Sequence, residues 1–162
     1  MIRTGATVHG RGRMRVVHGT GVLSRIVGRV LRLPRPSAGV DLQLTIVSAN
    51  GVERWTRTFD GLDIITEQRE TAPGVIAERF GRLEFDFRVE AENGADRYRQ
   101  VAARLLLFGG ARVTLPLVFA PRIEALERTN GAGRYSVQVR VTWPPAGVIV
   151  EYDGDVQLED HP

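Results

Sequence analysis

The sequence predicts a mainly β protein: a strongly curved antiparallel sheet or partly open β-barrel of about eight to ten strands, wrapped around one amphipathic helix. Three observations predict this fold. Apolar and polar residues alternate along most of the chain. All three asparagines (50, 93 and 130) precede a glycine, the pair that type I′ hairpin turns favour. Only residues 20–33 have the apolar spacing of a helix.

The chain has 162 residues, of which 43% are hydrophobic, which is enough for one packed domain. A disordered tail, a collagen-like fibre and a bare coiled coil are excluded. We expect a single domain over residues 1–162. Its first strand lies within 1–19, its helix spans 20–33, and an antiparallel meander occupies 40–158.

The first strand places Val8, Met14 and Val16 on one face, together with Gly10 and Gly12. Two glycines within a strand favour the close approach of another backbone. Later segments alternate in the same way, with one apolar and one polar face; their apolar positions are Leu42, Leu44 and Ile46; Trp55 and Phe59; Leu83, Phe85, Phe87 and Val89; Tyr135, Val137, Val139, Val141 and Trp143; and Val148, Val150, Tyr152 and Val156.

The helical segment repeats its apolar residues at i, i+3, i+4, i+7 and i+8 (Leu23, Ile26, Val27, Val30 and Leu31). Thr20 can cap the start, and Pro34 ends the helix. The arginines on the other side allow the helix to lie on a membrane, but we expect its apolar stripe to contact the core instead.

All 22 basic residues are arginine, against 19 acids, and residues 1–40 contain eight arginines and no acid. The lack of cysteine excludes disulfides, thiolate nucleophiles and zinc–cysteine sites, and it is consistent with a reducing cytoplasm. Residues 1–10 lack the apolar run of a signal peptide, and the longest apolar stretch, residues 105–111, is too short to cross a bilayer. We therefore expect a cytoplasmic protein.

The polar face of the first strand consists of His9, Arg11, Arg13 and Arg15. These side chains can bind phosphates, or they can pair with acidic residues of a neighbouring strand, such as Glu84, Asp86 and Glu90. The absence of interleaved aromatic residues favours acidic neighbours. Nucleophilic and metal chemistry are not indicated, since the four serines form no nucleophile elbow and His9, His18 and His161 are scattered. We expect no metal and no cofactor.

The better candidates are polar residues expected to point into the curved sheet. Arg122 and Glu124 share a strand face with Leu126, and Glu78 and Arg79 form a second acid–base pair. The candidate catalytic residues are therefore Glu78, Arg122, Glu124 and Tyr152. The candidate ligand-binding residues are Trp55, Arg57, Phe59, Arg79, Phe85, Phe87, Tyr98 and Trp143. Whether the Arg122–Glu124 and Glu78–Arg79 pairs are functional or purely structural stays open at this point.

Several motifs occur in order along the chain: His9-Gly10-Arg11-Gly12, the helix ending in Leu33-Pro34, Glu53 to Phe59, Glu78-Arg79-Phe80-Gly81, Ala120 to Ala125, and Tyr152-Asp153-Gly154. With these motifs the sequence resembles an uncharacterised family, a domain of unknown function often found C-terminal to saccharopine-dehydrogenase-like or epimerase-like NAD-binding modules. The resemblance implies a fold and no known activity.

Together these features predict binding of a hydrophobic small molecule inside the curved sheet, either without catalysis or as a cofactor-free cyclase or isomerase of biosynthesis. The alternative is a non-catalytic ligand-binding or protein-interaction module. Nucleic-acid binding through the arginine-rich N-terminal region ranks third. We expect neither a nucleic acid nor a membrane as partner, and a homodimer stays open.

Overall fold

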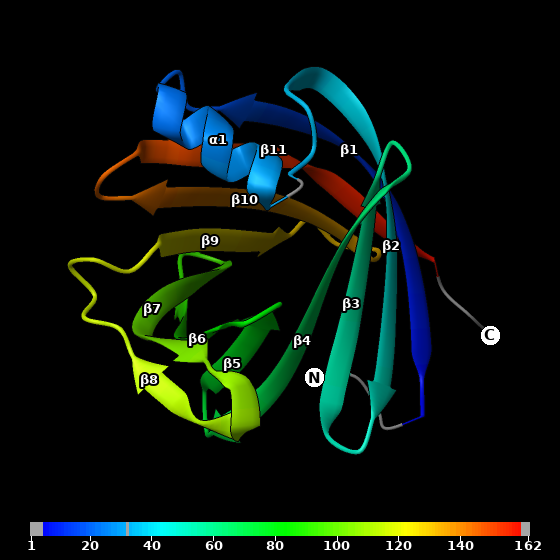
Figure 1. Cartoon of the computed structure of the whole chain (residues 1–162). Helices are drawn as coiled ribbons and strands as arrows, with labels where there is room; N and C mark the ends of the chain where they lie inside the picture. The colour runs from blue at the N-terminus through cyan, green and yellow to red at the C-terminus, as the bar shows by residue number, and fades with distance from the viewer. Residues whose placement is uncertain (1–4, 32, 160–162) are drawn as a thin grey trace.

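The computed structural model describes residues 5–31 and 33–159; His161, considered above as a metal ligand, lies outside them. Eleven strands and one α-helix form in this part of the chain (Figure 1). The strands are β1 (Thr7–His18), β2 (Ser37–Ala49), β3 (Val52–Phe59), β4 (Leu62–Ala72), β5 (Val75–Phe80), β6 (Leu83–Glu92), β7 (Ala95–Leu106), β8 (Arg112–Thr114), β9 (Arg122–Thr129), β10 (Arg134–Trp143) and β11 (Gly147–Glu159). The helix α1 is Val22–Val30, and a 3₁₀ turn, η1, is Phe108–Gly110.

Ten of these strands close into an antiparallel barrel. Each of β1 to β6 pairs with the strand that follows it in the sequence. The circle then continues from β7 to β9, β10 and β11, and β11 pairs with β1. The short strand β8 pairs with β7 beyond its contact with β9 and stands outside the circle. The prediction of a mainly β, barrel-like fold is confirmed, and closure leaves few unpaired edges.

Tight turns connect most of the hairpins. At Asn50-Gly51, Asn93-Gly94 and Asp60-Gly61 both residues have positive φ, as a type I′ turn requires. Asn130 differs, because its loop continues through Gly131, Ala132 and Gly133 with positive φ before β10 starts. The spacing of Asn-Gly pairs therefore predicted hairpins correctly at all three sites and the turn type at two.

Inward-pointing apolar side chains form the core in two clusters. One joins β1, β2, β3 and β11, and the other lies between β6 and β7; their buried members are Met14, Val16, Val40, Leu42, Leu44, Ile46, Phe59, Val150 and Val156, and Phe85, Phe87, Ala103 and Ala120. Gly12 lies against β11 as expected, since a Cβ there would approach the Asp155 carbonyl oxygen to 2.4 Å. The close contact between β1 and β11 thus depends on glycine.

The strand directions make the two ends of the barrel different. One end carries the short turns after β2, β4, β6 and β9. The other end, which we call the mouth, carries α1 between β1 and β2, the long connection between β7 and β9, and the turn between β10 and β11. At the mouth the Gln100 side chain bonds both the Pro121 carbonyl and the Ile123 N–H, so it bridges β7 and β9 where their ladder ends.

The helix lies across the mouth and contacts β11 and β1 (Figure 1). It is shorter than residues 20–33: its N-cap is Gly21 rather than Thr20, and it ends at Val30, before Pro34. Ser24 and Gly28 are its buried residues, and Ser24 Oγ donates to the Val148 carbonyl oxygen at 2.6 Å. The structure therefore differs from the expected core contact of the apolar stripe, because the small residues face the barrel and Ile26 and Val30 face outward.

Candidate functional site

A cavity of about 200 Å³ lies inside the barrel, between the two core clusters. Side chains from β1 to β11 except β8 contribute to its wall, and Leu31, Leu33 and Pro121 border it at the mouth. Most of the lining is apolar, from residues such as Leu42, Val139 and Val141. This volume exceeds the roughly 150 Å³ of an engineered apolar cavity that binds benzene, and it lies below the roughly 300 Å³ at which drug-sized pockets begin.

Arg57 on β3 is the cation of the cavity. Its Nη1 donates to Thr66 Oγ1 at 2.9 Å and lies 3.8 Å from a carboxylate oxygen of Glu78 on β5. Its guanidinium also stacks 4.9 Å from the ring centroid of Trp55. Alternation along β3 places Trp55, Arg57 and Phe59 on one face, so the charge is held between aromatic side chains.

Glu127 on β9 is the second carboxyl group of the cavity. The Tyr98 hydroxyl on β7 donates to its Oε2 at 3.1 Å. Burial raises the pKa of Glu127, and the charge of Glu78 adds to this, while the Tyr98 hydrogen bond and Arg57 act in the opposite direction. Burial and the charge of Glu78 therefore favour the protonated form of Glu127 relative to an exposed glutamate.

Aromatic rings form much of the remaining wall. Phe59 and Tyr152 meet edge to face with centroids 5.8 Å apart, and Phe87 and Tyr98 meet in the same manner at 6.4 Å. Burial is the largest cause that raises the pKa of both Tyr98 and Tyr152, so both phenols stay neutral. Neutral hydroxyl groups in this position can hydrogen-bond an uncharged polar group of a ligand.

Eight of the twelve candidate residues line this cavity: Trp55, Arg57, Phe59, Glu78, Phe85, Phe87, Tyr98 and Tyr152. Trp143 lies instead at the mouth, where its indole N–H donates to the Phe119 carbonyl oxygen at 2.8 Å. Arg79, Arg122 and Glu124 are on the outer wall of the barrel. Arg79 is separated from its sequence neighbour Glu78 because adjacent residues of a strand point to opposite faces.

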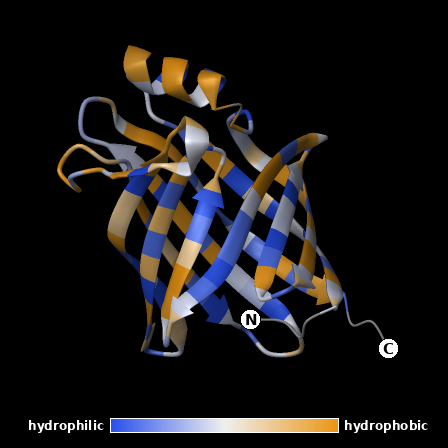
Figure 2. Cartoon of the chain, turned by 60° about the horizontal axis from the view of Figure 1, so that its bottom comes forward, coloured by the Kyte–Doolittle hydropathy of each residue, from blue (hydrophilic) through white to orange (hydrophobic). Residues whose placement is uncertain are grey.

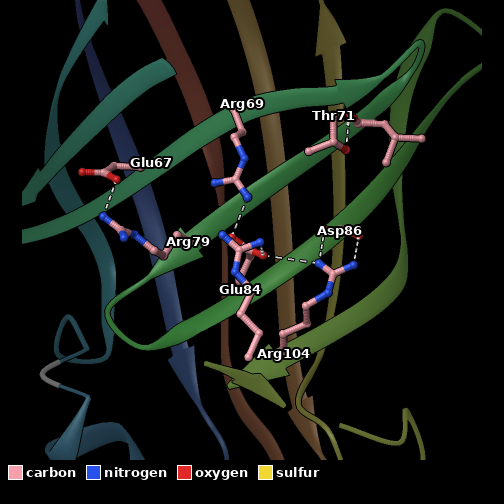
Figure 3. A network of polar contacts seen from close by, with 9 residues as sticks. Glu67, Arg69, Thr71, Arg79, Glu84, Asp86 and Arg104 are labelled. Atoms are coloured by element: carbon pink, nitrogen blue, oxygen red, sulfur yellow. Dashed lines mark hydrogen bonds and ion pairs between the residues drawn. The ribbon is translucent and has the colours of Figure 1, made fainter. Parts of the chain in front are cut away.

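Arg79 belongs to an outer network of ion pairs on β4 to β7, shown in Figure 3. It bonds Glu67, while Arg104 makes two bonds to Asp86. Glu84, at the centre, is only 1% exposed. Arg79 therefore lies in an ion pair with Glu67 on the barrel wall, outside the cavity.

Arg122 and Glu124 lie at an open depression of about 920 Å³ on the outer wall beside β7, β9 and β10. Both side chains are exposed, and the surrounding residues include Arg97, Arg99 and Arg140. Water reaches this depression freely, so its charges are screened. The interior cavity is the better candidate site because its charged groups are less exposed to water, with the side chains of Arg57 and Glu78 17% and 22% exposed.

Sequence reasoning missed Glu127, Thr66 and Gln68, which also line the cavity. The inward face of β9 was predicted from Leu126. Arg122 and Glu124 share this face of the strand, so they were expected inside the barrel. Ile123 and Ala125 carry the opposite signal, and they share their face with Glu127. Because this face of β9 has two apolar residues and the face of Leu126 has one, counting apolar residues would have placed Glu127 inside the barrel.

The arginine face of β1 has acidic neighbours, although not those expected. Arg11 pairs with Glu159 and Arg15 with Asp153, at 2.8 and 2.7 Å, both on β11 rather than at Glu84, Asp86 or Glu90. Residues 5–31 and 33–159 contain no group of three or more side chains suited to a metal ion. Over the same residues, no helix has the length and apolar character needed to cross a membrane.

Comparison with known proteins gives one match: residues 1–156 match a family described as a domain of unknown function, DUF4166. No curated protein and no solved structure matches the chain. The association with NAD-binding modules implied by the sequence resemblance stays a prediction.

Proposed function

Since the chain belongs to this family of unknown function, we propose its role from the barrel itself: it binds a compact apolar molecule that carries one polar group, such as a carbonyl. The observation that carries this proposal is the interior cavity of about 200 Å³, apolar over most of its wall, with Arg57, Glu78, Glu127 and Tyr98 gathered on it. In a mostly apolar cavity a few polar groups fix the orientation of the ligand.

The polar groups favour a neutral hydrogen-bond acceptor over a charged ligand. Arg57 is already paired with Glu78, and a protonated Glu127 can donate a hydrogen bond that a carboxylate cannot. A ligand carbonyl accepts this hydrogen bond, while its hydrocarbon part contacts the aromatic and aliphatic wall.

Cyclohexanone and methylcyclohexane are matched probes for this proposal, because they have similar size and differ in the carbonyl group. Binding is measured from the fluorescence of Trp55 in a Trp143→Phe background. We expect saturable binding of cyclohexanone that is tighter than that of methylcyclohexane, and a loss of the difference in Glu127→Met or Tyr98→Phe, each of which removes a hydrogen-bond donor. Removal of one hydrogen-bond partner changes affinity by roughly five-fold or more.

Ala125→Leu fills the cavity, whereas Ala49→Leu makes the same change at an exposed position at the end of β2. We expect the first variant to abolish probe binding and the second to leave it unchanged. Probe binding that survives in folded Ala125→Leu, or no saturable binding in the unaltered chain, contradicts the proposal.

A catalytic role is the second candidate, favoured by the ion-paired Glu78 and the buried Glu127 on one cavity. We propose that Glu78 removes a proton from the carbon next to a bound carbonyl while Glu127 or Tyr152 donates to the carbonyl oxygen, as a cofactor-free isomerase or cyclase requires. The test is hydrogen–deuterium exchange at those carbons of cyclohexanone in D₂O, followed by NMR. Exchange that is accelerated by the protein and lost in Glu78→Gln supports this role; exchange at the rate of buffer refutes it.

A further inference from the structure

Exposed apolar side chains are concentrated at the mouth of the barrel. Of the fourteen large apolar side chains that are exposed among the described residues, ten lie in two segments there. Four are on α1 and six are between β7 and β9: Val22, Leu23, Ile26 and Val30, and Leu107, Phe108, Val113, Leu117, Val118 and Phe119. We call α1 together with residues 107–119 the mouth surface. Figure 2 shows both segments as hydrophobic colour at one end of the barrel.

The two segments belong to one surface because both touch the turn between β10 and β11. Trp143, where this turn begins, donates its indole N–H to the Phe119 carbonyl oxygen. On the other side, a Cβ on Gly21 would lie 3.7 Å from the Ala146 carbonyl oxygen. The N-terminus of α1 and the segment before β9 therefore lie on either side of residues 144–146.

The orientation of α1 presents its apolar side to solvent. Ser24 and Gly28 are buried against the barrel, and successive residues of a helix turn by about 100°. Ile26 therefore points directly away from the barrel, with Val22 and Val30 beside it, and these three are 54%, 68% and 75% exposed. A packed surface helix of a globular protein shows the opposite arrangement.

Arginines outnumber acids around this surface. Arg25 and Arg29 are exposed and flank the apolar stripe of α1. Residues 19–36 and 107–121 contain arginines and no acid; the acid of the neighbouring β3–β4 turn is Asp60. An apolar helix face bordered by arginines is the pattern of helices that lie in the interface of an anionic membrane.

We propose that the mouth surface docks on the anionic surface of a lipid bilayer, with α1 parallel to the membrane plane and the exposed side chains of Phe108 and Phe119 inserted from the other segment. The sequence had argued against a membrane because the stripe of α1 was expected to contact the core, and its exposure removes that reason. Arginine disfavours a second copy as the occupant, since a two-fold contact through this surface brings Arg25 and Arg29 close to their own copies. This docking needs no occupant in the cavity, so it stands apart from the proposed function.

The test is sedimentation of the full chain with vesicles of phosphatidylcholine alone or of phosphatidylcholine mixed with phosphatidylglycerol. We expect binding to the mixed vesicles, weaker binding to phosphatidylcholine, and a decrease with added salt. Arg25→Gln combined with Arg29→Gln should weaken binding by roughly ten-fold or more. Its matched control is Arg128→Gln with Arg134→Gln, two exposed arginines at the opposite end of the barrel.

The apolar contribution is tested in the same assay. Ile26→Gln combined with Val30→Gln should reduce binding by roughly ten-fold or more, since both side chains leave water on docking. Val47→Gln with Ile65→Gln changes two exposed side chains of the barrel wall and should have no effect. All four positions are exposed, so the fold is retained, which circular dichroism checks.

Three outcomes overturn the proposal. The first is no binding to either kind of vesicle, and the second is an equal effect of the mouth variants and their controls. The third is a dimer that Ile26→Gln with Val30→Gln converts to a monomer, which identifies a second copy as the occupant. The probe-binding test of the cavity is independent, because a chain that fails on vesicles can still bind cyclohexanone.

Discussion

Glu84 offers a direct test of how the outer ion-pair network stabilises the barrel. Its carboxylate lies 2.8 Å from Arg69 and 3.3 Å from Arg104, which Figure 3 shows beside it. It also lies 3.5 Å from Arg112, and the Glu84 side chain is 1% exposed. Glu84→Gln keeps the shape and removes the charge. A hydrogen bond to a charged group contributes about 1.5–3 kcal/mol, but the amide keeps one acceptor oxygen and the arginines remain partly hydrated. We therefore expect a loss of about 2 kcal/mol in the free energy of unfolding, or about 4–8 °C in Tm.

Urea unfolding followed by far-UV circular dichroism measures this change. The matched control is Glu92→Gln, which removes the partner of Arg97 from an ion pair whose side chains are 59% and 54% exposed. An exposed pair contributes at most about 1 kcal/mol and often less than 0.5. Equal free energies of unfolding for the two variants would refute the reasoning, because burial of Glu84 would then have no energetic consequence.

Two further predictions concern the interior. Burial raises the pKa of Glu127 above its ordinary 4.5, so the native state holds this proton longer than the unfolded chain. The favourable contribution of this proton to the free energy of unfolding is complete below pH 4.5 and is lost as the pH rises through the raised pKa of Glu127. In Glu127→Gln the free energy of unfolding, measured with urea, should therefore change less over this pH range. An unchanged pH dependence in this variant contradicts the raised pKa of Glu127. Gly12→Ala places a Cβ 2.4 Å from the Asp155 carbonyl oxygen and should cost about 1–3 kcal/mol. Gly10→Ala should cost less, because its Cβ stays 3.1 Å from a Leu158 methyl group and 3.2 Å from the Gln157 carbonyl oxygen. Equal melting temperatures for the two glycine variants would contradict the close approach of β1 and β11.

The fold could be predicted from the sequence because its signals are local. Alternation of apolar residues marks each strand, and Asn50-Gly51 or Asn93-Gly94 marks a turn that joins two strands. The closure of the barrel depends instead on the pairing of β7 with β9 and of β1 with β11, which are matters of register between segments that do not follow one another directly. Gly10 and Gly12 indicated that another backbone approaches, but no local pattern identified that backbone as β11.

The site could be predicted only as far as the face of each strand was known. On β3 the aromatic Trp55 and Phe59 fix the inward face, so Arg57 between them was placed correctly. On β9 the single Leu126 outweighed Ile123 and Ala125, and a shift of one residue exchanges every side chain between the inside and the outside. Arg122 and Glu124 were expected inside for this reason, and Glu127 was missed.

The helix shows the limit of a hydrophobic pattern most clearly. Periodicity in residues 20–33 indicated a helix with an apolar stripe, but it carried no information about which side packs. The side of α1 that packs is set by close contacts with the barrel. Ser24 donates a hydrogen bond to the Val148 carbonyl oxygen, and a Cβ placed on Gly28 would lie 3.5 Å from the His18 ring. A bulkier residue at either position would lift α1 from the barrel, whereas the exposed stripe needs a second surface.

The difference between the two ends of the barrel connects the cavity with that second surface. At the end opposite the mouth, short turns close the hairpins, and the buried Glu53 accepts a hydrogen bond from the Trp55 indole at 3.2 Å, which fills the interior there. At the mouth, Leu33 and Pro121 border the cavity, and the segments that contain them continue into α1 and residues 107–119. We therefore expect a molecule from outside to reach Arg57 and Glu127 from the mouth, between these two segments. A membrane bound at the mouth surface would lie directly over this path, so an apolar ligand could move between bilayer and cavity without crossing water.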